Sequence, residues 1–353
     1  MSTDSRGRFG FEGVLDALGH PRVYLPLLLA VGLLPLPRFV PSFYVHISIL
    51  VFLIGSCAVA WNIIGGFGGQ FSLGNAMFLG IGAYATSILI MTHGMSAWVG
   101  MGVGILLAVL AAIVVGYPSF LLTGHYFALA TIAVVEGLWY LAIHFSDLTG
   151  GSAGLSVYGD PGWTTLIFPN RAPYFYLAYA LFLGSIAVSI YIRYSRLGYY
   201  LLAIRENQQA AESIGINTTR SKIYGFIISA VITSIAGSLY AVYIQFLSPG
   251  ATFSLDLSIQ FALATLIGGI GTIAGPIVGT LLLIPLEEYA TTVLGGQYGA
   301  LSYIGYGVVL ILFIIYAPEG LVERLRFVGD RIESAAPNFS SRSEPTAREE
   351  TDD

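Results

Sequence analysis

Residues 65–84, "GGFGGQFSLGNAMFLGIGAY", hold seven glycines among twenty residues inside a strongly apolar chain. In water, each glycine in a helix interior costs about 1 kcal/mol relative to alanine. In lipid, helices gain little from hydrophobic burial against one another, and small residues permit the close backbone contact that joins them. Ser72, Ala76 and Gly80 recur every four residues and predict one such small helix face. The stretch is therefore typical of a helix packed inside a membrane protein.

The composition of the whole chain agrees with a membrane location. Its 353 residues are 56% hydrophobic and only 10% charged, with a mean hydropathy of +0.77. The apolar residues come in blocks of about twenty, the length that crosses a hydrocarbon core of about 30 Å. Backbone polar groups in lipid must bond within the protein, so such blocks form helices. We expect an all-α, polytopic helical membrane protein with about ten transmembrane helices, eight to eleven being compatible with the pattern. The predicted spans are 23–37, 43–64, 76–93, 97–116, 125–145, 173–192, 223–245, 259–271, 275–294 and 298–317.

Basic residues orient these spans. With a cytoplasmic N-terminus, only Arg38 and Arg171, two of the 15 basic residues, lie outside. This distribution satisfies the positive-inside rule and predicts that both termini are cytoplasmic. The domain organisation follows as a cytoplasmic leader at 1–22, a transmembrane domain at 23–320 with a cytoplasmic loop at 193–222 and an outer loop at 146–172, and a cytoplasmic, largely disordered tail at 321–353.

Motifs for catalysis are weak. The histidines are far apart, Cys57 is the only cysteine, and no H-E-x-x-H pair is present, so no metal site is expected. "GGSAG" at 150–154 matches G-x-S-x-G in letters, but that motif needs a strand before the serine and a helix after it. An intramembrane serine hydrolase that pairs Ser152 with His125 or His144 remains an alternative. No Walker A sequence is present, so the chain has no ATP site of that type.

Ionisable residues at membrane depth would favour an ion-coupled carrier. The candidates are Glu136, Glu287, Glu288 and His46, and only Glu136, in "TIAVVEGLWYL", has apolar turns clearly on both sides. A protonated acid that joins two helices would explain Glu136 equally well. An ion-coupled secondary carrier of small polar solutes therefore stays open as a second hypothesis.

The cytoplasmic loop 193–222 carries five basic residues and predicts a helix over 199–214. One polar face of this helix has side chains at i, i+3, i+4 and i+7: Arg205, Gln208, Gln209 and Glu212. Gly215 fits a left-handed cap at its end. Such a helix either rests on lipid headgroups or serves as a short lever for a soluble partner, with Glu212 turned towards that partner.

Two glycine-rich breaks interrupt the predicted helices, at 65–69 and within "LIGGIGTIAG" (266–275). Non-helical backbone at membrane depth is tolerated only where protein covers it or water reaches it. Paired breaks often mark a substrate site, whereas two cytoplasmic turns between packed helices would have the same pattern. The candidate pathway or helix-packing residues are Gln70, Ser72, Asn75, Gly80, Thr131, Glu136, Gly268, Gly269 and Gly271.

Six stretches together resemble the LivM-type permease subunits of branched-chain amino acid ABC importers, in the family's order over residues 60–321. They are 65–84, "TGHYFALATIAVVE" (123–136), "TGGSAGL" (149–155), "SRLGYYLLAIRENQQAAESIGIN" (195–217), "GGIGTIAGPIVG" (268–279) and "APEGL" (317–321). Asn75 is a departure, because the family is expected to favour histidine there. Both side chains form hydrogen bonds.

This resemblance implies a non-catalytic transport subunit in the plasma membrane. A LivH-type partner permease would complete the pathway, two cytoplasmic ATPases would bind ATP and magnesium, and an extracytoplasmic binding protein would deliver the amino acid. The chain itself would bind lipid but no cofactor and no nucleic acid. The outer loop, with Tyr158 and Trp163, would help dock the binding protein. "AAESIG" resembles the ATPase-coupling segment of such permeases, which implies a coupling role for Arg205, Glu206, Asn207, Ala210, Ala211, Glu212 and Gly215.

Overall fold

The structure, a computed structural model, describes residues 35–122, 124–316 and 320–322, and these are mainly helical. The first half contains α3 (Leu36–Phe39), α4 (Ser42–Asn62), the π-helical turn η1 (Ile63–Phe67), α5 (Ala76–His93), α6 (Ala97–Ser119), α7 (His125–His144), α8 (Ser146–Thr149), the 3₁₀ turn η2 (Gly151–Ala153) and β1 (Leu155–Ser156). The second half contains α9 (Ala172–Arg193), α10 (Arg196–Glu206), α11 (Gln208–Ser213), α12 (Thr218–Ile244), β2 (Phe246–Leu247), α13 (Pro249–Thr252), α14 (Leu255–Gly268) and α15 (Ala274–Tyr316).

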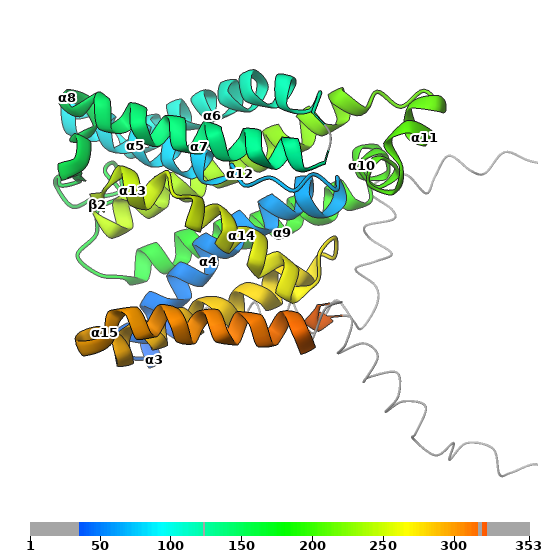
Figure 1. The fold of residues 1–353 in the computed structure, drawn as a ribbon. Coiled ribbons are helices and arrows are strands. Elements are labelled where there is room, and N and C mark those ends of the chain that lie inside the picture. Colours follow the sequence, from blue (N-terminus) through cyan, green and yellow to red (C-terminus); the bar gives the residue numbers. More distant parts are fainter. Residues whose placement is uncertain (1–34, 123, 317–319, 323–353) are drawn as a thin grey trace, which may run out of the picture.

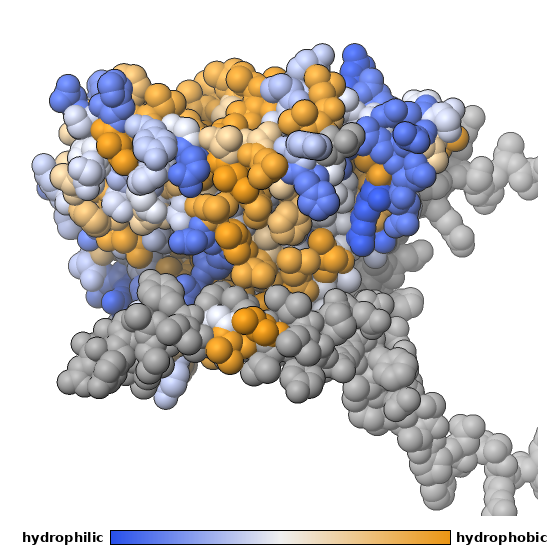
Figure 2. Space-filling model, viewed as in Figure 1, coloured by the Kyte–Doolittle hydropathy of each residue, from blue (hydrophilic) through white to orange (hydrophobic). Residues whose placement is uncertain are grey.

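The long helices run between two ends of the molecule (Figure 1). One end carries α8, α13 and β2, and the opposite end carries α10 and α11. Figure 2 shows hydrophobic side chains over the middle of the visible face, with hydrophilic side chains gathered at the end that carries α10 and α11. This distribution is that of a protein whose middle zone lies in a hydrocarbon layer.

Within the described residues, seven helices are long and apolar enough to cross a membrane, which confirms the polytopic helical fold. The span predicted at 259–271 begins earlier than expected, because Ser254 caps α14 by accepting the Asp256 N–H. α15 has 43 residues where two spans were predicted.

Several predictions lie outside the described residues. They are the leader 1–22, nearly all of the first span 23–37, and the tail 321–353 apart from its first two residues. The total number of spans and the cytoplasmic position of both termini therefore stay predictions.

Small residues bring α5, α6 and α12 into backbone contact, but the helix face predicted from Ser72, Ala76 and Gly80 is wrong in part, because Ser72 precedes α5 and is not helical. A Cβ on Gly82 of α5 would overlap the carbonyl oxygen of Ser234 on α12. A Cβ on Gly100 of α6 would lie 2.7 Å from the Thr86 Cα of α5. Gly80 lies against the Phe253 ring with no room for a side chain. These three helices form the most closely packed part of the fold.

Gly82→Ala should lower the free energy of unfolding in mild detergent by about 1–3 kcal/mol, since the added methyl group forces two backbones apart. Gly102→Ala is the matched control, because Gly102 is an exposed α6 glycine whose Cβ would have no neighbour within 4 Å. The control should be neutral or up to about 1 kcal/mol more stable, as alanine favours the helix. Equal stability of the two variants would contradict the packing argument.

Candidate functional site

Residues 68–75, between η1 and α5, are not helical, yet much of this stretch lies inside the protein. Two of its backbone groups and the adjacent first N–H of α5 are bonded by buried side chains from three different helices. Trp61 of α4 donates to the Ser72 carbonyl (2.6 Å), Thr131 of α7 accepts the Leu73 N–H (3.1 Å), and Ser258 of α14 accepts the Ala76 N–H (3.0 Å). The break is thus covered by protein, one of the two conditions for non-helical backbone at membrane depth.

Asn75 lies at the centre of this cluster and is fully buried. Its Nδ2 donates to the Ser229 hydroxyl of α12 at 2.9 Å, and its Oδ1 accepts from the Ser72 hydroxyl at 3.0 Å. The structure therefore brings together Ser72, Asn75 and Thr131 of the predicted set. Their contacts are with one another, with the Ser229 hydroxyl and with backbone, which is a geometry typical of helix packing.

Gln70 and Glu136 do not join this cluster. The half-buried Gln70 side chain bonds only the nearby Gly68 carbonyl, at 3.4 Å. Glu136 is half-buried on α7 and makes no hydrogen bond or ion pair within the described part of the chain. Sequence reasoning missed Trp61, Ser229 and Ser258, because no local pattern distinguishes them from the other polar side chains of their helices.

The second break, between α14 and α15, lies directly against the first. The Asn62 side chain in the last turn of α4 accepts the Gly271 N–H at 2.9 Å and donates to the Thr272 carbonyl at 2.8 Å. Gly269 and Gly271 have φ angles of +127° and +76°, which favour glycine. Gly268, the last residue of α14, has no room for a side chain because Gly275 lies against it. Of the predicted glycines, Gly271 contacts α4, through an asparagine that the sequence did not single out.

Both breaks approach α10 at the end that was predicted to be cytoplasmic. Arg205 Nη1 of α10 donates to the Gly66 carbonyl at 2.8 Å. Figure 1 shows the end of α4 and the α14–α15 connection on the side of the molecule that carries α10 and α11. This position agrees with cytoplasmic turns between packed helices.

The single helix predicted over 199–214 is wrong. Asn207 has an extended backbone between α10 and α11, with φ −159° and ψ 111°. Its side chain accepts the Ala210 N–H at 3.0 Å, so Asn207 starts a second helix as an N-cap. Arg205 therefore belongs to a different helix from Gln208, Gln209 and Glu212, and the predicted polar face does not exist.

Glu212 braces α11 against α12. Its Oε1 accepts from Gln208 Nε2 at 3.0 Å and from the Thr218 hydroxyl at 2.7 Å, and Lys222 Nζ donates to Gln208 Oε1 at 2.8 Å. The hydrogen bonds from Gln208 and Thr218, with the nearby Lys222 charge, hold the pKa of the Glu212 carboxyl below its ordinary value. The carboxylate is bonded within the chain through Oε1, while Glu212 as a residue stays exposed and accessible to a partner.

α11 ends as the sequence predicted. Gly215 has a φ of +87°, its N–H donates to the Glu212 carbonyl, and the Ile216 N–H donates to the Ala211 carbonyl. This is the Schellman arrangement that glycine favours. Ala211 is buried. The residues that stay exposed on this segment are Arg205, Glu206, Asn207, Gln209, Ala210, Glu212, Ser213 and Ile214, with Ile214 76% exposed.

The parts of a serine hydrolase site are not assembled. Ser152 lies in η2, preceded by a helical turn and not by a strand. His125 and His144 are the first and last residues of α7, and no hydrogen bond joins Ser152 to either within the described ranges.

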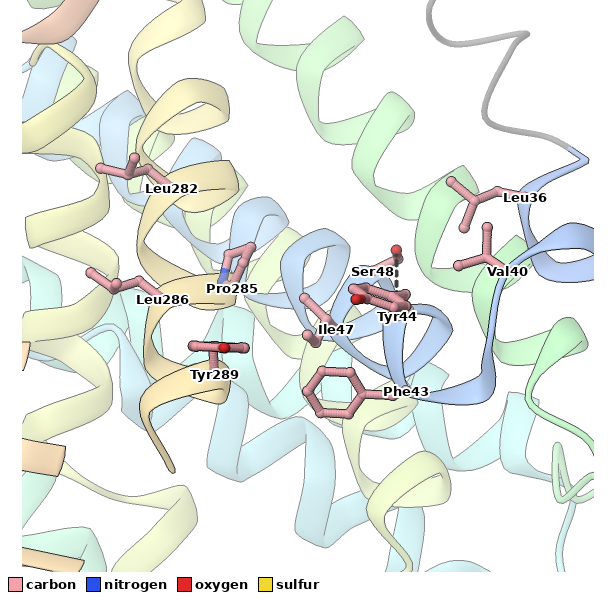
Figure 3. A pocket seen from close by; sticks show the side chains of 10 residues that line it. All are labelled: Leu36, Val40, Phe43, Tyr44, Ile47, Ser48, Leu282, Pro285, Leu286 and Tyr289. Atoms are coloured by element: carbon pink, nitrogen blue, oxygen red, sulfur yellow. Dashed lines mark hydrogen bonds between the residues drawn. The ribbon is translucent and has the colours of Figure 1, made fainter. Parts of the chain in front are cut away.

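An apolar groove of about 700 Å³ lies between α3–α4 and α15 (Figure 3). Its lining offers only hydroxyl groups as polar side-chain groups, and one of them, on Ser48, donates to the Tyr44 carbonyl at 2.8 Å. The groove has no partner for the charged groups of an amino acid, so we do not assign it to substrate. The lining residues are Leu36, Val40, Phe43, Tyr44, Ile47, Ser48, Leu282, Pro285, Leu286 and Tyr289.

Comparisons with known proteins agree with the resemblance. A family model described as "Branched-chain amino acid transport system / permease component" matches residues 43–316. The high-affinity branched-chain amino acid permease protein LivM of Escherichia coli K12 is 28% identical, covering 90% of this chain and 82% of its own. A probable LivM protein of Methanocaldococcus jannaschii is 27% identical, covering 80% and 85%. The LivH protein of Salmonella typhimurium LT2 is 32% identical over 40% of this chain and 45% of its own. No solved structure matches.

Thr131→Val should lower the free energy of unfolding by about 1–3 kcal/mol, since it keeps the side-chain shape but leaves the Leu73 N–H without its acceptor. Thr92→Val is the matched control, because the exposed Thr92 hydroxyl bonds only its own helix and a neighbouring histidine. Chemical unfolding in detergent measures both variants. A Thr131→Val protein as stable as the control would show that the break does not depend on this bond.

Proposed function

The chain belongs to the branched-chain amino acid transport permease family, and on this premise we propose that it is the LivM-type subunit of an ATP-driven importer of branched-chain or closely related amino acids. The observation that carries the proposal is the family match from the first turn of α4 to the last residue of α15. The chain is a multi-pass membrane protein, and the proposal places it in the plasma membrane. Catalysis is assigned to partner ATPases, which bind the ATP and magnesium, and this chain is assigned no cofactor.

We assign α10 and α11 (196–213) as the coupling segment that the ATPases contact. The exposed side chains of Glu206, Gln209 and Ile214 are free to face a partner. The bonds that join Gln208 and Glu212 to α12 would convey a displacement of α11 to that long helix. By this route Glu212 would transmit a displacement of α11 to α12, and its exposed side chain is also accessible to the ATPase.

A second permease would complete the transport pathway. Relatives of both the LivM and the LivH type match this chain, which supports a pair of related subunits. α6 and α7 are the candidate spans with the least burial inside this chain. Their outward side chains, including Leu106, Leu110 and Leu129, are therefore available to lipid or to the partner permease.

The outer loop 146–172 is the proposed contact surface for a binding protein. β1 of this loop pairs with β2 after α12, and the Trp98 indole of α6 donates to the Trp163 carbonyl at 2.9 Å. The loop is thus fixed to two helices while Tyr158 and Trp163 stay 71% and 63% exposed. Exposed aromatic side chains on a fixed support are typical of recognition surfaces. Substrate choice is then placed mainly in the binding protein, since an apolar pocket separates side chains that differ by one methylene by only about 1–3 kcal/mol.

The proposal is tested by purifying the tagged chain with its co-purifying partners and reconstituting them in vesicles with a loaded binding protein. We expect leucine, isoleucine or valine to accumulate only when ATP is supplied on the cytoplasmic side. Uptake that follows an ion gradient and ignores ATP would overturn the importer and favour the ion-coupled carrier.

Ile214→Asp should weaken attachment of the ATPases at least about tenfold, which is about 1.4 kcal/mol. The reason is that Ile214 directly follows the coupling segment with a large exposed apolar side chain. Burial of this side chain in a partner groove stabilises the complex, whereas burial of a carboxylate does not. Ile214→Leu keeps the apolar surface and should retain attachment. Quantitative co-purification checks both variants, and equal ATPase recovery from Asp and Leu variants would exclude this contact.

A further inference from the structure

We propose that Asn62 and Arg205 are positioning residues for transport, which join the coupling segment to both glycine breaks so that α10, the end of α4 and the α14–α15 connection move as one body. This inference rests on the coupling role proposed for α10 and α11. It assigns a role to Asn62, which sequence patterns did not reveal, and a new role to Arg205, which was expected to face a partner.

The Asn62 amide is fully buried and uses both of its ends. Its oxygen accepts the Gly271 N–H at 2.9 Å, and its nitrogen donates to the Thr272 carbonyl at 2.8 Å. An amide side chain that bonds both a donor and an acceptor of one backbone segment fixes that segment in position and direction. A leucine of similar size would leave the N–H and the C=O without these partners.

The glycines around this contact leave no room for a larger residue in their place. A Cβ on Gly66 would overlap the Asn62 Oδ1 and lie 2.8 Å from the Gly271 nitrogen. A Cβ on Gly271 would overlap the Arg205 guanidinium. Asn62, Gly66, Gly271 and Arg205 therefore occupy one compact contact between three segments that are far apart in sequence.

Arg205 completes the connection from the cytoplasmic side. It lies in the last turn of α10, and its Nη1 donates to the Gly66 carbonyl at 2.8 Å. Its Cγ would lie 3.0 Å from a Cβ on Gly69, so the aliphatic part also covers the start of the break. A charged donor makes a stronger hydrogen bond than a neutral one, which suits a contact that must persist during movement.

α10 is also held in place by an apolar contact that does not depend on the Arg205 hydrogen bond. The Leu201 side chain is fully buried, and its methyl groups lie 3.4 Å from the Cβ positions of Gly68 and Gly225. Removing the Arg205 bond therefore leaves α10 docked by Leu201 while breaking its polar link to Gly66. α11 keeps its separate link to α12 through Gln208 and Glu212, so the two routes can be tested apart.

The test measures the distance between spin labels at Tyr200 of α10, which is exposed, and Ile270 of the α14–α15 connection in the assembled transporter, with and without ATP. Cys57→Ala removes the only cysteine of the chain and supplies the background. In the parent we expect one narrow distance distribution that is the same in both nucleotide states. Asn62→Leu and Arg205→Met should each broaden it or make it depend on nucleotide, and lower ATP-driven uptake at least tenfold while the ATPases still co-purify.

Controls separate positioning from general stability. Arg205→Lys keeps a charged donor and should restore part of the transport, whereas Arg220→Met, at an exposed arginine in the first turn of α12 and outside the coupling segment, should behave as the parent. The double variant should be no worse than the worse single variant, because both residues act through one contact. If Asn62→Leu fails to assemble, the Arg205→Met and Arg205→Lys pair decides, since neither alters the buried break.

Normal uptake with an unchanged distance distribution in Arg205→Met would overturn the inference, and so would fully additive losses in the double variant. Failure of the proposed function has a different result: the parent protein itself would show no ATP-dependent uptake.

Discussion

The fold depends on how the non-helical residues 68–75 satisfy their backbone polar groups away from water. A helix bonds its own N–H and C=O groups, but this stretch must take partners from elsewhere. α4, α7 and α14 each supply one side chain to its backbone, and α12 holds Asn75 through Ser229. Four helices are therefore positioned by one short segment. The segment also sets where α5 begins and hence where its glycines meet α12.

Close backbone contacts in this structure need both glycines and polar side chains. Glycines such as Gly66 and Gly271 have no side chain to hold the two backbones apart. Polar side chains such as Asn62 then reach backbone groups across the contact. Since apolar burial does not distinguish one lipid-facing arrangement from another, these short polar contacts give the helices a defined register.

The sequence predicted the features that depend on local pattern and missed those that depend on tertiary contact. Seven spans follow from blocks of apolar residues, and the two breaks follow from their glycines. The partners of Asn62 are about 210 positions away, and nothing in the local sequence indicates them. The division between α10 and α11 was missed because Asn207 was read as part of a helix. Its tendency to cap a new helix outweighed the i, i+3, i+4, i+7 spacing of its neighbours.

α12 connects the two faces of the membrane through one rigid element. Its 27 residues span about 40 Å, with β2 and the outer loop at one end and the bonds to α11 at the other. If the binding protein docks on the outer loop and the ATPases on the coupling segment, a single helix belongs to both sites. Thermodynamic linkage then makes the coupling reciprocal. If nucleotide binding changes the affinity for the binding protein by some factor, docking of the binding protein changes the nucleotide affinity by the same factor. If both docking sites are as proposed, nucleotide binding on one side of the membrane and protein docking on the other are coupled binding steps that share one helix.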